Sequence, residues 1–360
     1  MKIGIDAKRA FFNHTGLGQY SRTLIGDLEE EMPHMEYFLF SPKMPGGKIP
    51  FKSPVVFPKG NRLFWRSYGL KKEIREKQID IYHGLSNEIP FVAHKKLPCK
   101  FVVTIHDLIA LKFPQWYPFA DAQIYKAKMR YACKYADKIV AISEVTKNDI
   151  LEMGWAPESK IELIYQSLSG AYQDFHSSKK IISDHPYLLY VGSFSERKNV
   201  LFLLQVFAKI SKQIPHQLFL VGNGSAAYNR KILSAISKLG IESRVKILNN
   251  ISNRELPQYY HNADLFLYPS QYEGFGLPVA ESLACGTPVI STLGTSMEEA
   301  GKSGGLFLPL ETVLWETAVI DLINDKARRT EYAEAGKSYV QKFSTKNIMP
   351  QWNRLYKSII

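Results

Sequence analysis

Short runs of β-branched and aromatic residues alternate with longer segments of helical periodicity along the first half of the chain. Strands are expected at 2–5, 37–40, 79–83, 100–104 and 138–142, with helices near 18–31, 65–77, 120–135 and 144–153. Strands that alternate with helices in this way are typical of a parallel sheet joined by crossover helices. The pattern therefore predicts the α/β fold class.

A second series of the same kind begins after a polar stretch at 166–185, which we interpret as an interdomain linker. Its strands are expected at 187–191, 217–221, 245–248, 265–268 and 288–291, with helices near 200–212, 228–239, 255–261 and 277–283. The two series predict two Rossmann-like units. Ligands of such folds bind outside the carboxyl ends of the strands, so functional residues are expected in the loops that follow them.

The length and composition agree with two globular domains, because 360 residues with 45% hydrophobic content can form two cores. Cys99, Cys133 and Cys285 lie far apart, so neither a disulfide framework nor a zinc site is indicated. The chain starts with MKIGID instead of a secretory signal, and no apolar run approaches the roughly 20 residues that cross a bilayer. We therefore expect a cytoplasmic location.

The chain carries a formal net charge of +12, which indicates an anionic partner. Eight basic residues and no acidic residue lie between 43 and 72, with five aromatic residues among them: Lys43, Lys48, Lys52, Lys59, Arg62, Arg66, Lys71 and Lys72. A nucleic-acid-binding protein is one alternative, but no nucleic-acid-binding motif accompanies the charge, so we expect no nucleic-acid partner. A solvated basic face is the plainer alternative for this segment.

Two sites of candidate chemistry follow strands of the first half. Gly16 and Gly18 follow the first strand, where backbone amides at a helix start suit a phosphate or sugar; a tight turn is the alternative. The third glycine of a dinucleotide site is missing, so no nicotinamide cofactor is expected. His106 follows the strand at 101–105, where an imidazole can bind a sugar hydroxyl or move a proton; loop packing is the alternative.

The second half offers a site for a diphosphate and its sugars. Arg197 and Lys198 lie between a strand and a helix, and adjacent cations there suit a diphosphate, unless they are solvated surface charges. Glu273 and Glu281 are eight residues apart and flank a helix start with backbone amides at Phe275, Gly276 and Leu277. We expect Glu281 in the first helical turn, with both carboxylates facing sugar hydroxyls at the two ends of a diphosphate.

The Glu-x7-Glu run from Glu273 to Glu281 resembles the motif of the family-4 retaining glycosyltransferases. Their GT-B fold has two facing Rossmann-like domains with parallel sheets and an interdomain cleft. The likeness extends to Ser143 in the run AISE and, in addition to the residues above, to three further stretches at 192–199, 221–224 and 263–270. The resemblance implies a sugar-nucleotide-dependent hexosyltransferase.

The resemblance also implies a role for each candidate residue. Arg197 and Lys198 would hold the donor diphosphate, together with the amides at 275–277 and the loop of Gly16 and Gly18. Glu281 would bind the ribose, whereas Glu273 and His106 would be the catalytic residues beside the transferred sugar. The mechanism would need no metal or other cofactor, and no Asp-x-Asp pair occurs in the chain.

Substrates and domain roles follow from the same likeness. Residues 1–168 would bind a glycan or lipid-linked acceptor, 169–344 the nucleotide diphosphate sugar, and a final helix at about 345–360 would pack back on the first domain. The segment 103–118 looks most like the mannosyltransferases, which implies mannose transfer in polysaccharide biosynthesis, with GDP, UDP and ADP left open as the nucleotide. The basic segment 43–72 would dock to the inner face of an anionic membrane. A GT-B sugar-nucleotide epimerase is the enzyme alternative.

Overall fold

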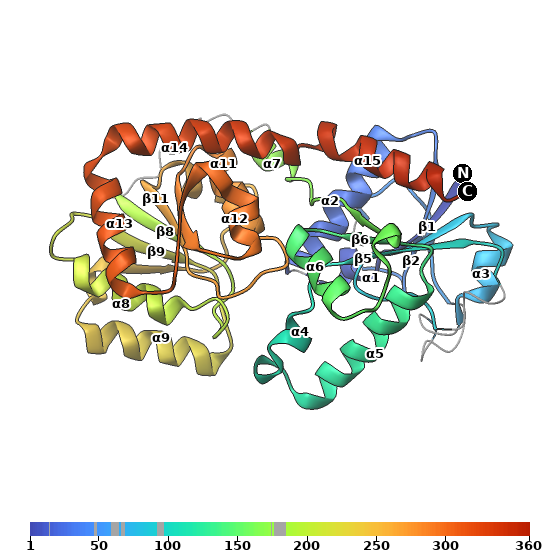
Figure 1. Ribbon diagram of the computed structural model, residues 1–360, viewed down its shortest axis with the longest axis horizontal. Coiled ribbons are helices and arrows are strands. Elements are labelled where there is room, and N and C mark those ends of the chain that lie inside the picture. Colours follow the sequence, from blue (N-terminus) through green and yellow to red (C-terminus); the bar gives the residue numbers. More distant parts are fainter. Residues whose placement is uncertain are drawn as a thin grey trace. The chain divides into compact units, whose positions relative to one another are not determined.

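The computed structural model of the chain describes residues 1–13, 15–46, 49–58, 65, 69–91, 97–173, 175 and 185–360. They form two compact units (Figure 1). Unit 1 consists of Met1–Ser167 and Thr345–Ile360, and unit 2 consists of Leu168–Ser344. This division lies one residue from the boundary expected after residue 168.

Unit 1 is built on a parallel sheet with the strand order β3-β2-β1-β4-β5-β6-β7. Its strands are β1 (Lys2–Asp6), β2 (Glu36–Phe40), β3 (Val55–Val56), β4 (Ile81–Gly84), β5 (Lys100–Ile105), β6 (Lys138–Ala141) and β7 (Ile161–Leu163). The order reverses between β1 and β4, both of which are largely buried. Loops after these two strands therefore meet at a switch point, where such sheets bind ligands.

The helices of unit 1 cover this sheet and include the last helix of the chain. They are α1 (Lys8–Phe12), α2 (Gly16–Glu31), α3 (Lys71–Glu76), α4 (Ile109–Lys112), α5 (Phe119–Tyr135), α6 (Glu144–Glu152) and α15 (Thr345–Ser358), with 3₁₀ turns at Pro114–Trp116 and Glu158–Lys160. Helix α15 lies against α2 (Figure 1) and buries Trp352 and Tyr356 in the core. The Tyr356 hydroxyl lies 2.8 Å from Nδ1 of the buried His83.

Unit 2 repeats the arrangement with the parallel order β10-β9-β8-β11-β12-β13. Its strands are β8 (Tyr187–Val191), β9 (Gln217–Val221), β10 (Val245–Leu248), β11 (Leu265–Tyr268), β12 (Val289–Thr292) and β13 (Gly305–Leu308). Its helices are α7 (Gly170–Gln173), α8 (Val200–Ile210), α9 (Ala226–Leu239), α10 (Leu256–His261), α11 (Leu277–Ala284), α12 (Ser296–Gly301), α13 (Thr312–Asn324) and α14 (Lys326–Tyr339), with 3₁₀ turns at Glu242–Arg244, Lys302–Gly304 and Val340–Phe343. Here the strand order reverses between β8 and β11.

The two parallel sheets confirm the predicted α/β fold class. Three strands were not expected, namely β3, β7 and β13, because two to four residues are too short to show a pattern. The division between the units falls within the linker expected at 166–185, and this stretch also contains α7, whose Tyr172 is buried in unit 2. In the parts of the chain described above, no helix combines the length and the apolar character needed to span a membrane.

Candidate functional site

The loops after β8 and β11 bring the predicted residues of unit 2 together at its switch point. Arg197 and Lys198 lie in the turn between β8 and α8, and Glu273 lies in the loop between β11 and α11. The backbone joins the two loops, because the amide of Gln271 donates to the carbonyl of Arg197 at 2.9 Å. Three residues that the sequence analysis selected separately therefore form one cluster.

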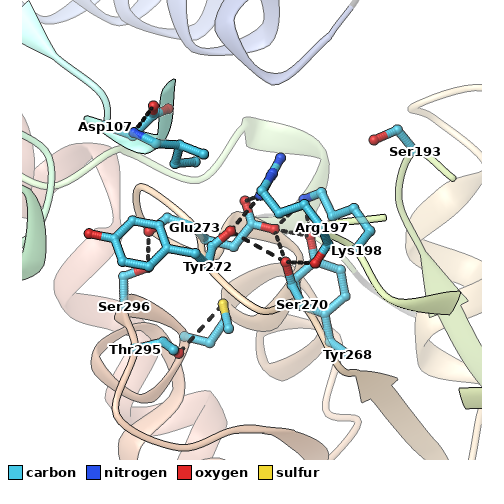
Figure 2. A network of polar contacts seen from close by, with 12 residues as sticks. Asp107, Ser193, Arg197, Lys198, Tyr268, Ser270, Tyr272, Glu273, Thr295 and Ser296 are labelled. Atoms are coloured by element: carbon cyan, nitrogen blue, oxygen red, sulfur yellow. Dashed lines mark hydrogen bonds and ion pairs between the residues drawn. The ribbon is translucent and has the colours of Figure 1, made fainter. Parts of the chain in front are cut away.

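The carboxylate of Glu273 is the centre of this cluster (Figure 2). Its Oε2 lies 2.7 Å from Nη1 of Arg197, and its Oε1 pairs with Nζ of Lys198. Oε1 also accepts hydrogen bonds from Ser270 Oγ at 2.6 Å and Tyr268 Oη at 3.1 Å. Two cations around one carboxylate leave the cluster with one positive charge in excess.

This environment determines the protonation of Glu273. Burial raises the pKa of the carboxyl, but the charges of Arg197 and Lys198 and the hydrogen bonds from Lys198 and Ser270 outweigh burial and hold the pKa at about 2. Glu273 is therefore ionised throughout the neutral range. A carboxylate stabilised in this way is a weak base and a weak nucleophile, so the geometry favours a role in binding and positioning.

Helix α11 begins directly behind Glu273, and Gly276 makes this start possible. Gly276 has a φ of +101°, and a Cβ there would lie 3.1 Å from Cα of Met297, so only glycine fits without strain. The Phe275 ring is buried against Phe343 at 5.0 Å between centroids. The helix start with Phe275, Gly276 and Leu277 is thus fixed beside the Glu273 cluster.

Glu281 lies on α11 in its second turn, so its expected place in the first turn is wrong. Its side chain is half-buried, and it accepts a hydrogen bond from Tyr260 Oη at 3.1 Å and one from Tyr172. Burial raises the pKa of Glu281 to about 8, although the two tyrosine hydroxyls act in the opposite direction. At neutral pH this carboxyl is mostly protonated and can both donate and accept hydrogen bonds.

His106 lies at the end of β5 in unit 1 and is buried. Its Nε2 is 2.8 Å from the carbonyl oxygen of Leu85, and the ring contacts Tyr20 edge-on at 4.5 Å between centroids. Burial, followed by the charge of Arg9, lowers the pKa of His106 to about 4 even though the Leu85 carbonyl raises it. His106 is therefore neutral near pH 7, and the carbonyl selects the tautomer with the proton on Nε2.

Residues that the sequence analysis did not select hold the backbone of His106. Asn87 Oδ1 accepts a hydrogen bond from the His106 amide at 2.8 Å, and Thr146 Oγ1 donates to its carbonyl at 3.0 Å. Ser143 caps α6, since its Oγ accepts from the Thr146 amide at 3.0 Å. The Ser-x-x-Thr spacing before a helix was the available signal for this support.

The glycine loop of unit 1 has a packing role at Gly18. A Cβ at Gly18 would lie 1.8 Å from the carbonyl oxygen of Asn13, and the Gly18 amide donates to Thr15 O at 3.0 Å. Gly16 begins α2 with open space at its Cβ position. Both glycines lie in the first turn of α2, where Gly18 allows close packing against Asn13, and a phosphate contact by this segment stays a prediction.

One further prediction concerns metal ions. Among the residues that the structure describes, no group of three or more His, Cys, Asp or Glu side chains could hold a metal ion.

Another prediction concerns the basic segment 43–72. Much of this segment lies outside the described residues, including four of its eight cations, namely Lys48, Lys59, Arg62 and Arg66. Membrane docking through this segment therefore stays a prediction.

Comparison with known proteins decides the family. Residues 25–167 match the family described as Glycosyltransferase Family 4, and residues 172–339 match the one described as Glycosyl transferases group 1. This chain belongs to the family-4 glycosyltransferases. The O-antigen chain mannosyltransferase B of Escherichia coli is 24% identical over 293 residues, which cover 79% of this chain and 76% of that protein.

Solved structures show that this glycosyltransferase has the GT-B fold. A sucrose-phosphate synthase from Thermosynechococcus elongatus superposes with a TM-score of 0.81 at 20% identity, covering 100% of this chain and 99% of the other. Anabaena Alr3699/HepE in complex with UDP and glucose gives a TM-score of 0.76 at 18% identity, covering 99% and 100%. The predicted family and fold are both confirmed.

Proposed function

We propose that this glycosyltransferase moves a hexose from a nucleoside diphosphate sugar to a hydroxyl of a glycan or lipid-linked acceptor, with retention at the anomeric carbon. The observation that carries the proposal is the Glu273 cluster, which joins two cations and a helix start at the switch point of unit 2. Positive charge at a helix start suits a diphosphate leaving group. Mannose is the favoured hexose because a relative is an O-antigen chain mannosyltransferase.

The proposed reaction breaks the bond between the anomeric carbon and the diphosphate oxygen and forms a bond to the acceptor oxygen on the same face. The acceptor proton passes to the departing diphosphate. Arg197 and Lys198 stabilise the negative charge that develops there, so the reaction requires no metal ion. A nucleotide donor agrees with the solved structure that contains UDP and glucose.

Glu273, His106 and Glu281 take different roles in this proposal. Glu273 keeps Arg197 and Lys198 together and orients the donor sugar; a pKa of about 2 argues against a nucleophile. His106 is neutral and binds a hydroxyl beside the transferred sugar, without acting as an acid. Glu281 binds the ribose hydroxyls in place of its tyrosine partners.

A panel of GDP, UDP and ADP sugars tests the proposal through thermal stabilisation and through transfer to water or a glycan. We expect one nucleotide class to raise the melting temperature, because a ligand that binds only the folded state stabilises it. Glu281→Ala should weaken donor binding by about 0.5–1.5 kcal/mol, the range for a hydrogen bond between neutral groups. An absence of stabilisation by all three classes, or conversion of the donor to its epimer without transfer, would contradict the proposal.

A further inference from the structure

A cavity of about 170 Å³ lies at the switch point of unit 1. Arg9 reaches it from α1, just after β1, and Asn87 and Glu88 reach it from the loop after β4. Asp121 and Lys128 of α5 form another side. The cavity therefore occupies, in unit 1, the place that the Glu273 cluster occupies in unit 2.

Arg9 is the exceptional residue of this cavity. Its Nε is buried and has no hydrogen-bond partner, and Arg9 forms no ion pair among the residues that the structure describes. Lys128, which lines the cavity from α5, is paired with Glu88 at 2.8 Å. Arg9 lines the cavity and has no ion-pair partner among the described residues, so an anionic or acceptor group in the cavity would supply the partner that its guanidinium lacks.

The cavity is linked through Asn87 to His106, the residue proposed to face the transferred sugar. Asn87 lines the cavity, and its Oδ1 accepts the hydrogen bond from the His106 amide at 2.8 Å. The charge of Arg9 contributes to the lowered pKa of His106, so the guanidinium is within electrostatic reach of the ring. A ligand in this cavity would therefore contact Asn87, which holds the His106 backbone.

The composition of the lining restricts the ligand further. Lys8, Arg9 and Lys128 face Glu88 and Asp121, which leaves one positive charge in excess. Carboxylate and amide oxygens suit sugar hydroxyls, whereas the planar donor fork of arginine matches a carboxylate or phosphate. We infer that this cavity binds an acceptor sugar that carries an oxyanion, with Arg9 as the contact for that group. The inference rests on the proposed function, since only a transferase has an acceptor.

Binding of three sugars that differ at one carbon tests the inference. Glucose, glucuronate and glucose 6-phosphate should be titrated by ligand-observed NMR at constant ionic strength. We expect the wild type to bind at least one of the acids about tenfold or more tightly than glucose, because charged hydrogen bonds exceed neutral ones. The two acids distinguish a carboxylate from a phosphate as the recognised group.

Three variants separate Arg9 from general charge. Arg9→Gln should abolish the preference for the acid, Arg9→Lys should keep part of it, and Arg130→Gln, an exposed change on α5, should keep all of it. Equal binding of the three sugars by the wild type would overturn the inference, as would a full preference in Arg9→Gln. If Arg9→Gln does not fold, Arg9→Lys provides the test. An unchanged preference for the acidic sugar in Arg9→Lys would reject recognition by the planar guanidinium of Arg9.

A second readout distinguishes failure of this inference from failure of the proposed function. Stabilisation by the nucleotide sugar depends on unit 2 and should persist in Arg9→Gln. Donor stabilisation without any acid preference rejects the Arg9 inference alone. If the protein prefers an acidic sugar but no nucleotide sugar stabilises it, the Arg9 cavity remains a binding site. The transferase function is then rejected, and the bound sugar can no longer be called an acceptor.

Discussion

The two units use the same sheet topology but treat charge at the switch point in opposite ways. In unit 2, Arg197 and Lys198 both pair with Glu273, which also accepts hydrogen bonds from Ser270 and Tyr268. In unit 1, the Arg9 Nε at the corresponding place is buried without a partner. A protein can thus prepare for an anion either with a complete ion cluster or with a single unpaired cation.

The difference has consequences for binding. The Glu273 cluster is ordered before any ligand arrives, so its cations need little reorganisation to stabilise a leaving diphosphate. The Arg9 Nε instead is buried without a hydrogen bond, and no described residue pairs with the guanidinium. We therefore expect mutations in unit 2 to affect both folding and turnover, and removal of the Arg9 charge to affect recognition alone.

The largest expected effect is on the folding of unit 2 in Glu273→Ala. This change leaves the buried Lys198 and the partly buried Arg197 without their carboxylate, and we expect a loss of about 3 kcal/mol in the free energy of unfolding, measured with urea. The triple variant that also carries Arg197→Ala and Lys198→Ala should recover much of this loss. Arg9→Gln should unfold close to the wild-type urea concentration; a comparable loss there would remove the contrast between the units.

The next largest effect is on transfer in the double variant Arg197→Ala, Lys198→Ala. Without the two cations the leaving diphosphate loses its main stabilisation, so the rate should fall about 10²–10³-fold or more. The wild-type rate should persist in EDTA. Inhibition by EDTA that magnesium or manganese reverses would show instead that a metal supplies the charge.

A smaller effect concerns the pH dependence of stability through Glu281. Its folded pKa of about 8 exceeds the unfolded value of 4.5, so the folded state binds the proton more tightly. The stability is then complete below pH 4.5 and is lost as the pH rises toward 8. Between pH 5 and pH 8 the free energy of unfolding of Glu281→Gln should therefore rise by about 1–3 kcal/mol relative to that of the wild type. If calorimetry gives the same pH dependence of stability for both proteins, the raised pKa of Glu281 is refuted.

The smallest effect compares helix caps in the two units. Ser143→Ala and Ser225→Ala each remove a side-chain cap, of α6 and α9, and each should cost about 1 kcal/mol of stability. Only Ser143→Ala should also slow transfer, because the capped Thr146 holds the His106 carbonyl. Equal transfer rates in Ser143→Ala and Ser225→Ala would show that the cap of α6 does not affect the site.

The sequence predicted the sheets and the Glu273 cluster for different reasons. Long buried strands such as β8 and β9 show a continuous apolar run, whereas β3 and β7 are held in register only by their neighbours. Arg197 and Glu273 lie in recognisable motifs at strand ends. Arg9 has no such motif, since an unpaired side chain is a property of three-dimensional packing that no spacing encodes.

The partner tyrosines of Glu281 illustrate the same limit. Tyr172 comes from the polar stretch 166–185, and Tyr260 comes from α10. Their contact with Glu281 joins three separate segments and appears only after the helices pack. The raised pKa therefore could not be predicted from the Glu-x7-Glu spacing.

Helix α15 makes unit 1 discontinuous in the chain, and this determines the order in which the units are completed during synthesis. Unit 2 emerges from the ribosome as one uninterrupted stretch, whereas unit 1 waits for residues 345–360 to supply Trp352 and Tyr356. Until then His83 lacks its tyrosine partner and the sheet has an uncovered apolar face. The nascent chain therefore completes unit 2 first and unit 1 last.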